Sequence, residues 1–136
     1  MTPHATPDLA PSLADLERLA EAAFRALPPE VCTACAGLAI RVEDFADDAT
    51  LDELDIEDPF ELTGLYDGVA LTERSVMAQP TRPDVVWLYR RPILEEWIER
   101  GDVGLAQLVA HVLIHEIAHH LGWSDDDIRR IDDWTE

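Results

Sequence analysis

The sequence is short of positive charge. It contains no lysine and ten arginines against 29 acidic residues, and its formal net charge is −19. A surface of this sign repels nucleic acid and anionic membranes, so we expect neither as a partner. No apolar run reaches the length of about 18 residues that a membrane-spanning helix needs. Residues 1–12 also lack the basic and apolar pattern of a secretory signal, which favours a cytoplasmic protein.

Cysteine is also scarce. Cys32 and Cys35 form a lone Cys-x-x-Cys pair. Without a second pair, this spacing is weak evidence for structural zinc. No strand-to-helix context of the thioredoxin type surrounds the pair, so we interpret the two residues as ordinary thiols.

The length of 136 residues suits one domain. Residues 1–11 carry three prolines and read as a flexible tail, which leaves residues 12–136 for the domain. Ser12 is placed to cap an amphipathic helix that Pro28 and Pro29 end. Within the acidic stretch of residues 46–58, a short helical turn is expected over residues 50–54, and a loop is the alternative.

Strand patterns follow the first helix. Residues 38–45 alternate apolar and polar side chains, which predicts a half-buried strand, and the apolar run 85–89 predicts a buried one. Asp67-Gly68 between apolar residues is typical of a hairpin over residues 62–71. Short helices are expected over residues 93–99 and 124–134. The predicted class is therefore α+β, with a small mixed sheet.

Four of the five histidines lie between His111 and His120, around the motif His115-Glu116-Ile117-Ala118-His119. Residues four apart project from one face of a helix, so His115 and His119 can bind one ion at roughly 2.0–2.1 Å for zinc. Glu116 lies beside such an ion, where a general base can take a proton from metal-bound water. The alternative is a pair of surface histidines with acidic neighbours. The apolar surroundings favour the metal, because buried polar groups need partners.

A catalytic zinc site needs a third protein ligand and one open position. Gly122 can take the left-handed conformation that ends a helix, and Asp125 follows it by three residues. We predict Asp125 as the third ligand. Alternatively, Ser124 caps a last helix with Asp125 in its first turn, and both roles can hold at once. Two imidazoles and a carboxylate favour Zn²⁺, although ligand type alone leaves iron or manganese open.

His111 extends the histidine stripe by one turn. His111 and His119 lie roughly 12 Å apart along a straight helix, so all three histidines cannot bind one ion. A pair of His111 with His115 is the less favoured alternative, and His111 is interpreted as a wall of the site. His120 points about 100° away from His119, which favours a structural role.

The run from His115 through Gly122 and Asp125 resembles the small bacterial zincin-like metallopeptidase family, and so does the run of residues 58–75. The resemblance extends from about residue 37 to the end of the sequence. It implies a compact minimal zincin fold with a metal-binding helix and a short C-terminal helix. It also implies zinc on His115, His119 and Asp125, with Glu116 as the base.

The predicted function is a zinc-dependent metallopeptidase. By the same resemblance, the hairpin at residues 62–71 supplies a strand edge for peptide substrates, and a plain hairpin is the alternative. No methionine follows the motif, and the sequence continues for only 17 residues after His119, which leaves little room for a second lobe. We therefore expect weak activity, on peptides or unfolded proteins. The alternatives are a metal-binding protein without peptidase activity and an acidic interaction protein with an accidental motif.

Overall fold

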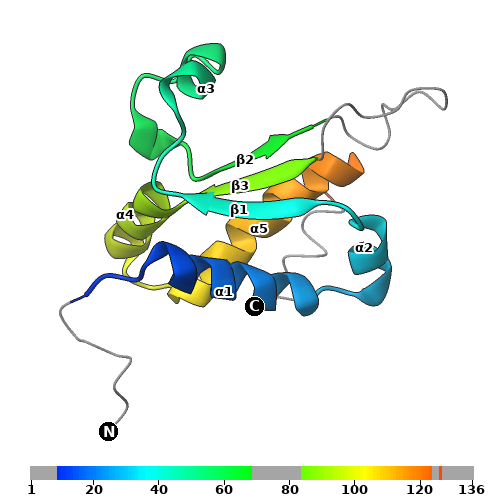
Figure 1. The fold of residues 1–136 in the computed structure, drawn as a ribbon. Coiled ribbons are helices and arrows are strands. Elements are labelled where there is room, and N and C mark those ends of the chain that lie inside the picture. The colour runs from blue at the N-terminus through cyan, green and yellow to red at the C-terminus, as the bar shows by residue number, and fades with distance from the viewer. Residues whose placement is uncertain (1–8, 69–83, 124–125, 127–136) are drawn as a thin grey trace, which may run out of the picture.

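The computed structural model describes residues 9–68, 84–123 and 126. These residues form both helices and strands, and the fold is α+β, as predicted (Figure 1). The elements in order are α1 (Leu13–Arg25), α2 (Pro29–Ala34), β1 (Ala39–Glu43), α3 (Asp48–Glu53), the 3₁₀ turn η1 (Pro59–Glu61), β2 (Gly64–Asp67), β3 (Val85–Tyr89), α4 (Arg90–Arg100) and α5 (Leu105–Leu121). No helix in the described ranges is long and apolar enough to cross a membrane.

The described strands form one mixed sheet in the order β1-β3-β2. β3 lies between a parallel neighbour, β1, and an antiparallel neighbour, β2 (Figure 1). Ala39 pairs with Val85 in the parallel register, and Gly64 pairs with Leu88 in the antiparallel one. The strands predicted within residues 38–45 and 85–89 are confirmed as β1 and β3. The second half of the predicted hairpin, residues 69–71, lies outside the described residues.

Alternation along β3 gives the sheet two different faces. Val86 and Leu88 are fully buried in the main core, which α1 and α5 complete. The side chains of Trp87 and Tyr89 point to the opposite face, where they pack with Leu51 of α3 in a smaller cluster. Figure 1 shows α3 standing away from α1 and α5. The sheet therefore separates α3 from the helix that carries the histidine motif.

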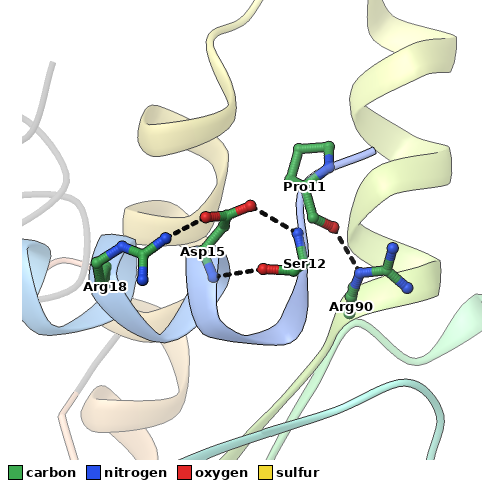
Figure 2. A network of polar contacts seen from close by, with 5 residues as sticks. All are labelled: Pro11, Ser12, Asp15, Arg18 and Arg90. Atoms are coloured by element: carbon green, nitrogen blue, oxygen red, sulfur yellow. Dashed lines mark hydrogen bonds and ion pairs between the residues drawn. The ribbon is translucent and has the colours of Figure 1, made fainter. Parts of the chain in front are cut away.

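Helix α1 begins where the sequence predicts, and its start is fixed by a capping box (Figure 2). Asp15 N–H donates to the Ser12 hydroxyl at 3.1 Å, and Ser12 N–H donates to the Asp15 carboxylate at 2.8 Å. Arg18 pairs with the same carboxylate. Just before the cap, the Pro11 carbonyl accepts a hydrogen bond of 2.6 Å from Arg90 Nε. The last contact joins the segment just before α1 to the first turn of α4.

Two element boundaries differ from the predictions. Pro29 opens the short helix α2 instead of only ending α1, because proline suits the first position of a helix. Helix α4 begins at Arg90 and not at residue 93, since Pro92 falls within its first turn, where backbone N–H groups need no partner in the helix. The predicted helix at residues 124–134 lies outside the described residues.

Candidate active site

Helix α5 carries the histidine motif and ends at Gly122 in the left-handed conformation, with φ 70° and ψ 34°. Trp123 N–H bonds the Ala118 carbonyl at 2.9 Å, which closes the last turn. The chain therefore turns where the sequence predicts. Asp125, the predicted third ligand, lies outside the described residues.

The motif side chains differ in exposure. His115 and Glu116 are half-buried, and His119 is exposed. His119 Nδ1 lies 3.2 Å from Glu116 Oε1. When that nitrogen carries the proton and donates to the carboxylate, the lone pair of His119 is on Nε2, which is the atom offered to a metal. The carboxylate thus orients an imidazole in the way that metal sites commonly do.

A metal requires more than two ligands. Within residues 9–68, 84–123 and 126, no three His, Cys, Asp or Glu side chains are grouped so that they could hold an ion. His115 and His119 stand one helical turn apart on α5, so these two residues fit the chemistry of a zinc ligand pair. A third protein ligand for such a site would lie outside the described residues.

Glu116 is enclosed between α5 and β2. Burial raises the pKa of its carboxyl, whereas His119, the backbone N–H of Tyr66 and His115 act in the opposite direction. The backbone N–H of Tyr66 lies in β2, so this strand contributes to the electrostatic surroundings of Glu116. A half-buried carboxylate beside an imidazole has the chemistry that a general base requires.

Gly64 allows this close approach, and the sequence analysis missed it. A Cβ at this position would lie 2.8 Å from Val112 Cγ1 and 3.2 Å from Glu116 Cγ. Any side chain here would therefore push β2 away from α5. The available signal was a glycine at the start of a predicted strand, which commonly marks a close backbone approach.

The remaining histidines of α5 take different positions. His120 is 3% exposed, and its Nδ1 lies 3.0 Å from the Tyr66 hydroxyl and 3.6 Å from Asp84 Oδ2. It ties α5 to β2 and to the residue before β3, in keeping with the structural role predicted for it. His111 is exposed, and its ring centroid lies 4.5 Å from that of His115. His111 therefore borders the motif.

Comparison with known families agrees with this geometry. The profile of the zincin-like metallopeptidase family matches residues 35–135. This chain belongs to the zincin-like metallopeptidase family. Among curated proteins, none matches it. The matched range of this zincin-like protein includes β2, all of α5 and position 125, so the resemblance stated from the sequence is confirmed.

Proposed function

We propose that this zincin-like protein is a zinc-dependent peptidase that hydrolyses peptide bonds in peptides or unfolded proteins. His115, His119 and Asp125 would hold the zinc, and Glu116 would act as the general base. The observation that carries the proposal is the Glu116 carboxylate, half-buried under β2 and 3.2 Å from the ring of His119. Membership of the family supports the same chemistry.

The chain's own groups supply the proton transfer. When bound, zinc acts as a Lewis acid and lowers the pKa of water toward about 7. Glu116 takes the proton of the attacking water on its carboxylate and later returns it to the leaving amine. The close approach of Gly64 to Glu116 leaves the side chain of Glu116 little room to change its orientation. Restricting the base to one orientation avoids reorganisation at the moment of reaction.

Strand β2 is also the element on which a peptide would lie. Among the described residues it pairs only with β3, on one of its two edges. An extended peptide that pairs with the other edge gains backbone hydrogen bonds and comes to lie along the strand that covers Glu116. A binding site formed by one strand edge suits extended, unfolded chains better than folded proteins.

Metal analysis of protein purified without a histidine tag tests the first part of the proposal. We expect about one zinc per chain, and we expect His115→Ala and His119→Ala to lose it. His111→Gln is the matched control and keeps the metal, because His111 is placed outside the ligand set. A protein without stoichiometric metal would contradict the proposal and favour an acidic interaction protein.

Glu116→Gln tests the second part. It keeps the size of the side chain and removes the base, so we expect zinc to stay bound. Cleavage of a fluorogenic peptide library should fall by about 10²–10⁴-fold. Zinc bound without any Glu116-dependent hydrolysis would identify a metal-binding protein instead of a peptidase.

A further inference from the structure

The face of the sheet opposite α5 carries a cavity of about 560 Å³. All three described strands contribute to its lining, and the segment from β1 through α3 forms the rest. From β2, Leu65 and Asp67 line the cavity, while Gly64 and Tyr66 face α5 and its Glu116. The cavity and the general base therefore lie on opposite faces of the same strand.

The cavity is strongly negative. Four carboxylates line it, from Glu43, Asp47, Glu53 and Asp67, and no lining residue is basic. Glu43, Asp47 and Glu53 are exposed at its rim. Asp47 also caps α3 by accepting a hydrogen bond of 2.8 Å from Thr50 N–H, which lowers its pKa and keeps it ionised. A cation entering the cavity would meet several ionised oxygens.

The inner part of the cavity is aromatic, with Phe45, Trp87 and Tyr89 in its lining. Tyr89 is 3% exposed. No group among the residues that the structure describes hydrogen-bonds to its phenol oxygen, although buried hydroxyls nearly always have a partner. Burial, followed by Asp47 and Asp67, raises the pKa of Tyr89 to about 12, so the phenol stays protonated at neutral pH. This buried hydroxyl needs a partner that a ligand could supply.

We propose that this cavity binds the guanidinium group of an arginine side chain on a bound peptide. Guanidinium is planar, stacks on aromatic rings and donates several hydrogen bonds in a fixed fork to carboxylates. One ring of the lining already makes such a contact, because the Arg91 guanidinium carbon lies 5.6 Å from the centroid of Phe45. Lysine has the same charge but lacks the planar fork and the stacking.

The position of the cavity links it to the substrate. Side chains of an extended peptide alternate between the two faces of a sheet. A peptide paired beside β2 would direct one residue toward Glu116 and a neighbouring residue toward the face of Leu65 and Asp67. We therefore place the arginine next to, or within about two positions of, the scissile bond. This placement rests on the proposed function, whereas guanidinium recognition itself does not.

Calorimetric titration of the full chain with blocked tripeptides tests the recognition. The Glu116→Gln variant prevents turnover, and the central residue of the peptide is arginine, lysine or citrulline, the neutral isostere of arginine. We expect arginine to bind about tenfold more tightly than citrulline, because only the charged group interacts with the carboxylates and the ring faces. Citrulline binding as tightly as arginine, or lysine binding more tightly, would overturn the proposal.

Variants then localise the effect. Glu43→Gln and Glu53→Gln should each weaken arginine binding about two- to fivefold, the size expected of partly exposed ion pairs. Glu17→Gln, which makes the same charge change on the exposed face of α1, is the control and should leave binding unchanged. Tyr89→Phe keeps the ring and removes the hydroxyl, and should weaken the binding of the arginine peptide. If Glu17→Gln weakened arginine binding as much as Glu43→Gln and Glu53→Gln do, the binding would depend on the overall negative charge of the protein. That result would overturn the assignment of arginine binding to this cavity.

The two proposals can fail separately. Zinc content and Glu116-dependent cleavage of arginine-free peptides report only on the peptidase. If cleavage persists while arginine and citrulline peptides bind alike, the cavity proposal is wrong and the peptidase stands. If no peptide is cleaved but arginine binding depends on Glu43 and Glu53, the guanidinium site stands and the peptidase proposal is wrong.

Discussion

Replacing Gly64 by alanine should both destabilise the protein and displace the carboxylate that we propose as its general base. The new Cβ would lie 2.8 Å from Val112 Cγ1 and 3.3 Å from the Trp87 carbonyl oxygen. Carbon atoms in contact prefer about 3.5–4.0 Å, so β2 and α5 must separate by roughly 1 Å. Overpacking of this kind costs about 1–3 kcal/mol in the free energy of unfolding.

Activity should fall further than stability explains. The same Cβ lies 3.2 Å from Glu116 Cγ, so the carboxylate moves with the helix or changes its rotamer. A displacement of about 1 Å in a catalytic group can reduce turnover by about 100-fold. We therefore expect Gly64→Ala to lose most peptide hydrolysis at a temperature where it remains folded. Its zinc content should fall much less than its activity, because the new Cβ touches neither His115 nor His119 and reaches His119 only through the Glu116 carboxylate.

A double-mutant cycle with Val112→Ala isolates the contact. Val112→Ala removes Cγ1 and makes a small cavity, and the Cβ that Gly64→Ala adds would then occupy part of that space. Urea unfolding of the four proteins should show a favourable coupling energy of at least about 1 kcal/mol. Two results would refute the reasoning. One is a free energy of unfolding for Gly64→Ala within about 0.5 kcal/mol of that of the unmodified protein, and the other is strict additivity of the two changes.

Contacts away from Glu116 give three more measurable expectations. Tyr66→Phe removes the hydroxyl beside the buried His120 and should cost about 1–2 kcal/mol of unfolding free energy, measured in urea; an unchanged midpoint would contradict this. Ser12→Ala should cost about 1 kcal/mol through loss of the helix cap, whereas Ser12→Thr should retain most of the stability. Burial, and then the neighbouring Cys32, raises the pKa of Cys35 to about 11, so alkylation of Cys35 at pH 8 should be slow until urea unfolds the chain and should accelerate as the pH approaches 11. Rapid labelling of the folded protein at pH 8 would show that this thiol is accessible and ionised.

Local chemistry explains what the sequence predicted well. Ser12 begins α1 because its hydroxyl satisfies a backbone N–H three residues later, which is a contact within one helical turn. The apolar run of β3 and the alternation of β1 likewise follow from periodicity alone. The spacing of His115 and His119 sets them on one face of α5 without reference to any other element.

Contacts between distant segments could not be predicted in this way. The glycine at position 64 signals a close backbone approach, but it does not identify Glu116 as the neighbour, because that contact depends on how the sheet docks on α5. The cavity arises from three strands and α3 meeting around Tyr89, so no short pattern encodes it. Pro29 was ambiguous locally, since the same residue ends one helix and suits the first turn of the next. The role of Asp125 as a ligand stays a prediction.

The match to the family begins at residue 35, yet the interior of the protein begins earlier. Leu16 and Ala20 on α1 have no exposed surface, and they belong to the same cluster as Leu113 and Ile117 of α5. A fragment that began at residue 35 would lack α1, and the apolar face of α5 that packs on α1 would be exposed to water. Whoever trims this protein for expression or grafts its motif elsewhere should treat the first helix as inseparable from the histidine helix.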